Sequence, residues 1–436
     1  MSNNAFRLSI AEIKNADHHW QQTIIPYQHL HYCPASAGSW GILRVALLVP
    51  ESAMLLVAPA ACGRHGAIAG IQLGFKKNLF LLHVDEIDIV SGQHLDKIPQ
   101  AVAEILVTTQ PRPKAMIICA TCIDDLLGSD YDALAQQLEA SHGIPVRICH
   151  MVPTAHDGKS PPAFAVQQTM YDFLEKSVAK NRAVNIVGSY VPIDAESEFY
   201  KVMDVAGFGK IRHVAYCATF HEFRRMGDAS HNILIRPNGR LAVEQMERKL
   251  GIPHCSAPVA YGLDAIAQTY RTLEEFLSTT LNTEKYHEEA QDTVKKYRKE
   301  LGPLSVAIGS TVNGSPFELA RALTGYGFQV RYIFADQVFD FDREHVDWLK
   351  QHNAGIEVFT NIHPTMANFI EHQLTVDVAL GFDAGYFCPG SKTVPLLPDQ
   401  QPFGYQCVSY LFREIIKALE NPQSHKEQMF ASGAVI

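Results

Sequence analysis

The segment KAMIICATCIDDLLGSDYDALAQQLEASHGIPVRICHMVP, residues 114–153, places an apolar strand, a helix and a second apolar strand in direct succession. Leucines recur at helical intervals through its middle, at Leu126, Leu127, Leu134 and Leu138, and Gly143 follows where a helix would end. A helix between two apolar strands is typical of an α/β domain with a mostly parallel sheet. Ligands of such sheets bind at the carboxyl ends of the strands.

The same alternation of strands and helices continues upstream of this segment. Apolar runs predict strands at 42–50, at 54–59 and at the start of 79–92, where an acidic edge and a turn follow. The glycine-rich residues from Gly63 onward are expected to begin a helix that packs closely on a ligand, and 94–109 has helical spacing of apolar residues. Residues 1–32 show no clear core stripe, so we expect them to be peripheral.

Two further α/β units are expected downstream. The second begins with a strand in AVNIVGSY, continues with a strand in IRHVAYCA, and ends in one long charged helical stretch at 263–300 that connects to the next unit. The third opens with LSVAIGS and adds strands in QVRYIFAD, IEVFTN and VDVALG. The predicted domains are therefore 1–182, 183–300 and 301–436, which agrees with a chain of 436 residues being too long for one hydrophobic core.

Composition narrows the class of protein. With 46 acidic and 37 basic residues the chain carries a formal charge of −9, which argues against nucleic acid as a partner. The N-terminal residues show no basic start followed by an apolar run, and the longest apolar runs are about half of what a membrane crossing needs. We therefore expect a cytoplasmic protein with no membrane partner. In that compartment the nine cysteines are expected to be buried thiols, metal ligands or reactive groups, and not disulfides.

Several familiar cofactor motifs are missing from the sequence. It contains no GxxxxGK[ST] loop, no GxGxxG after a predicted strand and no HExxH, and no histidine cluster stands out as a zinc site. The sequence therefore gives no sign of ATP, dinucleotide or zinc binding by the familiar routes. Among the scattered histidines, His65 stands out because it lies close to Cys62.

Three cysteines fall at loop or strand-end positions beside small residues. Cys33 lies in YCPASAG, Cys62 in APAACGRHGA, and Cys122 in CATCIDDLLGSD. Cys119 and Cys122 form a Cys-x-x-Cys pair, which by itself is compatible with a redox dithiol, half of a zinc site or a coincidence. No second pair exists to complete a zinc ribbon.

Taken together, these segments resemble component 1 of the nitrogenase family. The second cysteine follows the first by 29 residues in a Cys-Gly turn, and the third follows 60 residues later in a T-C-x-x-x-x-x-G-x-D motif that ends at Gly128 and Asp130. DIVSG at 88–92 resembles the family's acidic-led strand and turn, and GIPHCSAPVAYG resembles its Gly-Ile-Pro strand in the second domain. The resemblance covers nearly the whole chain and implies three Rossmann-like parallel-sheet domains.

The resemblance also implies a cofactor and partners. In that family three cysteines from each of two related subunits hold an interfacial iron–sulfur cluster, so Cys33, Cys62 and Cys122 are expected to bind iron. The cluster would be a P-cluster-like [8Fe-7S] or a [4Fe-4S] centre shared with a homologous alpha-type catalytic subunit, in an α2β2 heterotetramer. A separate ATP-dependent iron–sulfur reductase protein would dock transiently and supply electrons. Thiolates suit such a centre because they are soft, anionic iron ligands.

Departures from the family pattern indicate which subunit this chain resembles. The catalytic subunit holds its active-site cofactor with a cysteine in the second domain and a histidine in the third. Here Ile235 lies near the expected cysteine position, and SKTVPLLPDQQPFGYQC contains no histidine. The chain therefore resembles the non-catalytic, beta-type subunit, with no catalytic residue of its own. Cys217, Cys255, Cys388 and Cys407 align with no family ligand and are expected to be buried and inert.

Within the family the chain is most similar to the methylthio-alkane reductases, which reductively cleave carbon–sulfur bonds. Three alternatives stay open at this point. The chain could be a subunit of a tetrapyrrole reductase, of the protochlorophyllide or nickel-sirohydrochlorin type, or a scaffold for nitrogenase-type cofactor assembly that turns over no substrate. It could also be a three-domain α/β protein whose cysteines are only core residues.

Overall fold

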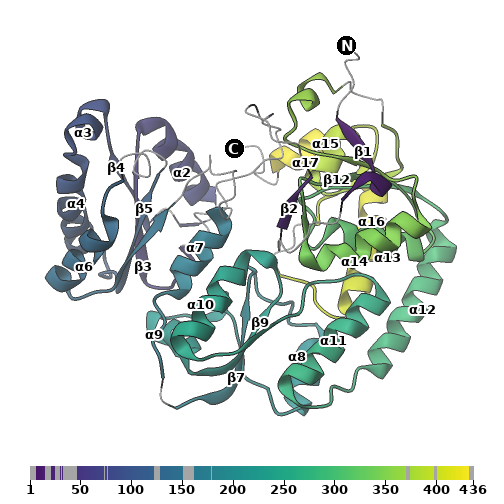
Figure 1. Cartoon of the computed structure of the whole chain (residues 1–436), viewed down its shortest axis with the longest axis horizontal. Helices are drawn as coiled ribbons and strands as arrows, with labels where there is room; N and C mark the ends of the chain where they lie inside the picture. Colours follow the sequence, from purple (N-terminus) through teal and green to yellow (C-terminus); the bar gives the residue numbers. More distant parts are fainter. Residues whose placement is uncertain are drawn as a thin grey trace. The chain divides into compact units, whose positions relative to one another are not determined.

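The computed structural model describes residues 6–14, 21–24, 30, 32, 47–72, 74–75, 77–121, 128–150, 162–177, 179–369, 374–396 and 400–431 (Figure 1). The chain divides into two compact units. The two-sheet unit contains the described residues of 39–192 and 207–257, and the six-stranded unit contains those of 1–38, 193–206 and 258–435. Within the described residues, no helix has both the length and the apolar character needed to cross a bilayer.

The first sheet of the two-sheet unit is parallel, with the strand order β4-β3-β5-β6. Its strands are β3 (Ser52–Ala58), β4 (Leu79–His83), β5 (Ala115–Ala120) and β6 (Val146–His150). Its helices are α2 (Ala60–Gln72), α3 (Glu86–Ser91), α4 (His94–Thr108), α6 (Tyr131–His142) and α7 (Pro162–Tyr171). Every residue of β3 and β5 is buried, as expected for central strands whose two faces are both covered.

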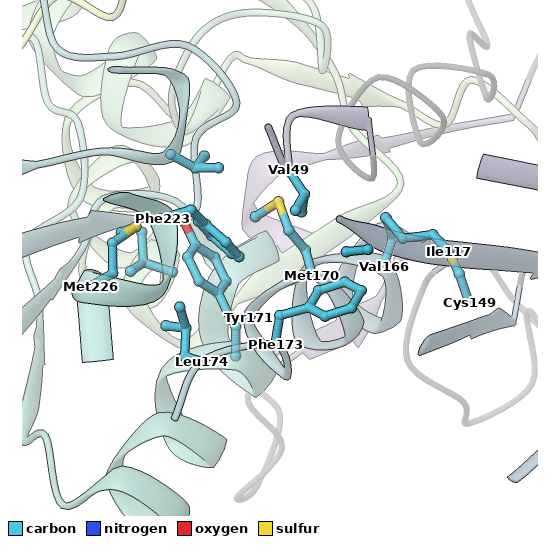
Figure 2. Close-up of a cluster of buried hydrophobic side chains, with 14 of the residues drawn as sticks. Val49, Ile117, Cys149, Val166, Met170, Tyr171, Phe173, Leu174, Phe223 and Met226 are labelled. Atoms are coloured by element: carbon cyan, nitrogen blue, oxygen red, sulfur yellow. The ribbon is translucent and has the colours of Figure 1, made fainter. Parts of the chain in front are cut away.

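Two hydrophobic clusters cover the two faces of this sheet. On one face Ile98 and Val102 of α4 and Leu138 of α6 pack against alternate strand residues. On the other face Val166 and Met170 of α7 pack against Ile117 and Cys149, as Figure 2 shows. This second cluster continues through Tyr171 and Phe223, whose ring centroids lie 6.2 Å apart, to the second sheet of the same unit. The two sheets therefore share one core.

The second sheet is also parallel, with the order β10-β9-β7-β8. Its strands are β7 (Asn181–Val187), β8 (Ile211–Arg212), β9 (Ala229–Leu234) and β10 (His254–Ser256). Between them lie the short helices η2 (Val214–Tyr216), α9 (Phe220–Arg224), η3 (Arg225–Asp228) and η4 (Pro237–Gly239), and the longer α10 (Arg240–Leu250).

The six-stranded unit has the sheet order β1-β14-β12-β11-β15-β16, in which only β1 runs antiparallel to its neighbour. The strands are β1 (Arg7–Ser9), β11 (Ser305–Ile308), β12 (Gln329–Phe334), β14 (Glu357–Phe359), β15 (Val378–Leu380) and β16 (Lys392–Val394). A separate pair joins β2 (Gln21–Thr23) to β13 (Gln337–Phe339).

The same unit contains eight of the described helices. They are α8 (Glu198–Val205), α11 (Leu263–Leu277), α12 (Glu284–Leu301), α13 (Pro316–Gly325), α14 (Arg343–His352), α15 (Phe382–Phe387), α16 (Gln406–Glu420) and α17 (His425–Ala431), with the 3-10 turns η1 (Ile10–Glu12), η5 (Asp340–Asp342) and η6 (Pro364–Asn368).

The α/β class and the parallel sheets are confirmed. Three parallel sheets occur in the order in which the sequence predicts them, while the domain boundaries at 182 and 300 stay a prediction.

Five local predictions are wrong, and three of them concern predicted strands. In the strand expected at 42–50, Leu47 is helical and 48–50 form turns and a bend, and 42–46 lie outside the described residues. DIVSG lies mostly in helix α3, because Asp85 and Asp88 form a capping box that begins a helix there. The strand expected in IRHVAYCA stops after Arg212, because the side chain of His213 accepts a hydrogen bond from the Ala215 N–H and begins a 3-10 turn.

The stretch 263–300 is two helices and not one. Helix α11 ends where Ser278 takes a left-handed φ of 50°, and α12 begins at Glu284.

The N-terminal segment is not peripheral. Strand β1 pairs in register with β14, Arg7 with Phe359 and Ser9 with Glu357, and Ile10 directly after it is fully buried. This pairing joins residues about 350 positions apart in the sequence, so no short sequence pattern predicts it.

Candidate functional site

The first sheet of the two-sheet unit has a topological switch point between β3 and β5. From β3 the chain moves to β4 on one side of the sheet, and then crosses back to β5 and β6 on the other side. Val57 near the end of β3 and Ala120 at the end of β5 are register partners in the parallel ladder. Ligands of open α/β sheets bind outside the carboxyl ends of the strands at such a point.

Cys62 lies at this switch point. β3 ends at Ala58 and α2 begins at Ala60, so Cys62 is in the first turn of the helix, where the helix dipole favours negative charge. Its side chain is half-buried and packs against the cluster shown in Figure 2. A half-buried thiol at the end of a rigid strand has the access and the fixed position that a metal ligand needs.

Cys33 and Cys122 lie outside the described residues. The residue before Cys122, Thr121, is buried and follows the last residue of β5 directly. The remainder of the T-C-x-x-x-x-x-G-x-D motif has a structural role. Gly128 adopts a left-handed φ of 64°, and the Asp130 carboxylate caps α6 by accepting a 3.0 Å hydrogen bond from the Ala133 N–H.

The glycines that follow Cys62 serve helix-to-sheet packing. A Cβ on Gly63 would lie 2.3 Å from a methyl carbon of Leu81, and a Cβ on Gly70 would lie 2.9 Å from one of Leu79. Both leucines belong to β4, so the glycines let α2 lie directly on this edge strand. Contact with a ligand, which the sequence predicts, is not needed to explain these two glycines. The side chain of His65 in α2 lies outside the described part of the structure.

Cys119 is a core residue. It is fully buried in β5, in register with the equally buried Cys149 of β6, and both belong to the cluster that contains Val166 and Met170. Of the Cys-x-x-Cys pair, Cys119 therefore packs inside the fold. Cys119 is fully buried, whereas Cys62 is only half-buried.

The remaining four cysteines have environments that keep the thiol protonated. Burial raises the pKa of Cys217 to about 11, that of Cys255 to about 12 and that of Cys388 to about 12. Burial, followed by the charges of Glu198 and Glu318, raises the pKa of Cys407 well above its usual range. Because the thiolate is the form that binds metal and attacks electrophiles, these positions suit inert thiols.

The switch point of the second sheet lies between β7 and β9, and closely packed backbone fills it. Gly188 follows β7 with a φ of 104°, and a Cβ there would lie 2.4 Å from the carbonyl oxygen of Arg236. A Cβ on Gly239 would lie 2.6 Å from the Cα of Gly188. Ile235, which stands near the expected cysteine position of a catalytic subunit, is 1% exposed and follows β9 directly. Neither Ile235 nor these packed glycines offers a cofactor ligand.

The switch point of the six-stranded unit, between β11 and β15, is filled by a carboxylate. Asp383 near the start of α15 is fully buried. It accepts hydrogen bonds from the Ser310 N–H at 2.6 Å and hydroxyl at 2.8 Å, and from the Thr311 hydroxyl at 2.7 Å. The Asn361 amide donates to it at 3.0 Å. A Cβ on Gly309 would lie 1.8 Å from its Oδ1.

Asp383 therefore occupies the place where sheets of this type commonly bind an anion. Its carboxylate ties together the loops after β11, β14 and β15. The sequence analysis missed this network. Its only signal is a polar Gly-Ser-Thr immediately after LSVAI and a Gly-Phe-Asp immediately after DVAL, and the two are about 70 residues apart.

Within the described residues, no group of three or more histidine, cysteine, aspartate or glutamate side chains is arranged to hold a metal ion. Of the predicted iron ligands only Cys62 is described, and its donor chemistry, partial exposure and switch-point position fit an iron–sulfur centre. Cys119 and Cys149, buried in mid-sheet, do not fit one.

The comparisons with known proteins point in one direction. A family model described as "Nitrogenase component 1 type Oxidoreductase" matches residues 38–420. The "Nitrogenase iron-molybdenum cofactor biosynthesis protein NifE" of Rhodobacter capsulatus is 25% identical over 239 residues, 52% of this chain and 49% of that protein. NifE of Rhizobium meliloti (strain 1021) is 23% identical over 408 residues, 86% of this chain and 82% of that protein.

One further sequence relative and one solved structure also match this chain. The "Nitrogenase molybdenum-iron protein alpha chain" of Clostridium pasteurianum is 27% identical over 210 residues, 47% of this chain and 38% of that protein. The solved structure "Nitrogenase Cp1 at pH 6.5" superposes with a TM-score of 0.70 at 15% identity, covering 91% of this chain and 95% of that one. At that identity the superposition shows a shared fold. The chain spans about half the length of the first of these sequence relatives.

Proposed function

The chain belongs to the nitrogenase component 1 type oxidoreductases, and we propose that it is an electron-relaying subunit that holds an iron–sulfur cluster through Cys33, Cys62 and Cys122. A related alpha-type subunit supplies the remaining ligands, and an ATP-dependent iron–sulfur reductase protein supplies the electrons. The observation that carries the proposal is the position of Cys62, a half-buried thiol in the first turn of α2 at a topological switch point.

The chain's own residues would prepare this site in three ways. β3 and the first turn of α2 hold the Cys62 thiol at the sheet edge, and β5 leads to Cys122 from the neighbouring strand. The close packing of α2 on Leu79 and Leu81 of β4 fixes the position of the helix. When bound, the cluster supplies one-electron transfer without a large change of structure.

Three ligands from one chain leave a cluster incompletely ligated, which is why the proposal includes a partner subunit. The beta-type assignment rests on the missing cofactor ligands, Ile235 in place of a cysteine and no histidine in 391–407. The Clostridium pasteurianum relative is named as an alpha chain, so the choice of subunit type depends on those two positions alone.

The proposed reaction is reductive cleavage of carbon–sulfur bonds in methylthio-alkanes. It rests on the resemblance of the sequence to that branch, since none of the relatives reported above is a methylthio-alkane reductase. A test is ATP-dependent turnover. The anaerobically purified complex of this chain, its partner subunit and the reductase protein should release a thiol and an alkane from a methylthio-alkane. A complex that contains iron, accepts electrons and leaves the substrate intact would contradict this reaction.

A second function is favoured by a specific observation, namely that two of the relatives are cofactor biosynthesis proteins. In this alternative the chain is a scaffold that holds a cluster while a nitrogenase-type cofactor is assembled, and it turns over no substrate. Transfer of a metal cofactor from the purified complex to a cofactor-free acceptor protein, without substrate turnover, would favour the scaffold over the reductase.

A further inference from the structure

Two histidines flank the predicted cluster site on the outer strands of the same sheet. His83 is the last residue of β4 and pairs in register with Ala58 of β3, and His150 is the last residue of β6 and pairs with Ala120 of β5. Both side chains are exposed. They therefore lie at the carboxyl edge of the sheet, on either side of the strands that lead to Cys62 and Cys122.

The two histidines lie on opposite faces of the sheet. Successive strand residues alternate between faces. Leu79 and Leu81 face α2, because Gly70 and Gly63 of that helix approach their side chains, while Phe80 and Leu82 pack in the cluster on the other face. His83 therefore follows Leu81 on the face that α2 covers.

His150 is directed to the other face. The residue before it, Cys149, packs in the cluster on the α2 and α7 side. The His150 ring makes an edge-on contact with Tyr131 of α6, with centroids 6.0 Å apart, and Tyr131 belongs to the opposite cluster. Of the two histidines, only His83 shares a face with Cys62.

The backbone that carries His83 also lies next to the backbone that leads to Cys62. The Val84 N–H donates a 3.2 Å hydrogen bond to the carbonyl of Ala58, so the ends of β3 and β4 are joined, and Cys62 is only four residues beyond Ala58. Gly63, the residue after Cys62, lies against the side chain of Leu81, where an added Cβ would be 2.3 Å from a methyl carbon, and Leu81 is two residues before His83 in β4. The His83 imidazole and the Cys62 thiol therefore leave neighbouring backbones at one edge.

We propose that His83 supplies a nitrogen ligand to the iron–sulfur cluster that Cys62 helps to hold, an inference that rests on the proposed function. A neutral imidazole donates its nitrogen lone pair to iron, with no change in the number of electrons and, if the ring is already neutral, no proton released. Imidazole ligation in place of thiolate removes a negative charge from the centre and raises its reduction potential. The cluster in this chain would therefore have mixed cysteine and histidine ligation.

The test is pulsed EPR of the reduced complex, purified anaerobically with its partner from cells grown on histidine labelled with nitrogen-15. The proposal predicts a strong hyperfine coupling from a directly bound histidine nitrogen. His83→Ala should abolish this coupling. His83→Cys should keep the cluster, lack the coupling and lower its midpoint potential. The matched control His150→Ala changes an exposed histidine at the end of the other outer strand, and should leave the coupling and potential unchanged.

The outcomes distinguish a failure of the His83 assignment from a failure of the proposed function. An iron-containing wild-type complex without histidine coupling would overturn the His83 assignment and leave the proposed function standing. A wild-type complex without iron would overturn the proposed function itself. Loss of iron from His83→Ala, with iron kept by His83→Cys and His150→Ala, would support ligation, because a cysteine replaces the lost donor.

Discussion

Val57 of β3 and Ala120 of β5 lie side by side in register, near the ends of two parallel strands that continue to Cys62 and Cys122. The two strands are the buried centre of their sheet, so their relative position is fixed by core packing and not by loops. The span from Cys62 to Cys122 contains the rest of α2, then β4, the two helices α3 and α4, and the crossover back to β5. The sheet thus brings together Val57 and Ala120, which are 63 positions apart in the sequence.

Gly63→Val should loosen the first turn of α2. A Cβ at this position would lie 2.3 Å from the end of the Leu81 side chain, so both side chains must shift. We expect a loss of unfolding free energy of about 1–3 kcal/mol, as for other overpacked sites. Because Leu81 is the obstacle, adding Leu81→Ala should restore much of this loss. Urea unfolding of the two single variants and the double variant measures the coupling. If the losses of unfolding free energy in the two single variants simply add in the double variant, the contact between residue 63 and Leu81 is contradicted.

Gly309→Ala should destabilise the six-stranded unit strongly. Its Cβ would lie 1.8 Å from Oδ1 of Asp383, which is buried and held by several donors and so cannot move away. We expect a loss of about 3 kcal/mol or more. The control is Gly325→Ala at the end of α13, where a Cβ meets no atom within 4 Å and stability should change little. Equal effects of the two changes on the urea midpoint would show that the Asp383 network is not rigid.

Stability should depend on the protonation of Glu318. Burial raises the pKa of this carboxyl from 4.5 to about 7, and the N–H groups of Gly262 and Tyr261 offset that rise only in part. Between these two values the folded chain binds a proton that the unfolded chain has lost. The contribution of Glu318 to stability is therefore greatest below pH 4.5 and falls as the pH rises to about 7, by on the order of 3 kcal/mol.

The variant Glu318→Gln, which cannot ionise, isolates this contribution. The buried His213 and the half-buried His345, whose pKa values burial lowers to about 4, act in the opposite direction but are the same in both proteins. The difference in unfolding free energy between wild type and variant should therefore shrink or reverse as the pH rises from 4.5 to 7. A difference that stays constant over this range would mean that Glu318 titrates normally in the folded chain.

Much of the fold follows from local pattern. Continuous apolar runs such as MLLVAP and KAMIICA became the fully buried strands β3 and β5, since a strand covered on both faces has no polar side to reveal. Helix α6 ends at Gly143 with a φ of 67°, as the sequence predicts, but it begins only at Tyr131 after the Asp130 cap, later than the helical spacing from Leu126 indicates.

The misses have identifiable causes. The apolar residues of EIDIVS suggest a strand, but the capping pair Asp85 and Asp88 favours a helix, and Ile87 and Val90 are left exposed. Strand β1 has only three residues and exists because β14 offers a free edge. The Asp383 network draws its donors from three loops, and no pattern within any one of them shows that the side chains converge.

The candidate site was predictable in part. The strand before Cys62 is a local feature and was predicted, but the structure places Cys62 in the first turn of α2, four residues after the end of β3, and not in a turn at the strand end. The role of the neighbouring glycines was not predictable, because Gly63 and Gly70 are explained by Leu79 and Leu81 from the next strand. His83 carries no local signal at all, and only the register of β4 with β3 shows that it ends at the same edge.

The most direct test of the central claim is the iron and sulfide content of the anaerobically purified complex, measured for wild type, Cys62→Ala and Cys217→Ala. Cys62 and Cys217 are both half-buried and pack against the same core, so the two variants remove similar side chains from similar surroundings. The account predicts several irons per complex in the wild type, a large loss in Cys62→Ala, and wild-type content in Cys217→Ala. Full iron content in Cys62→Ala, or an iron-free wild type, would contradict it.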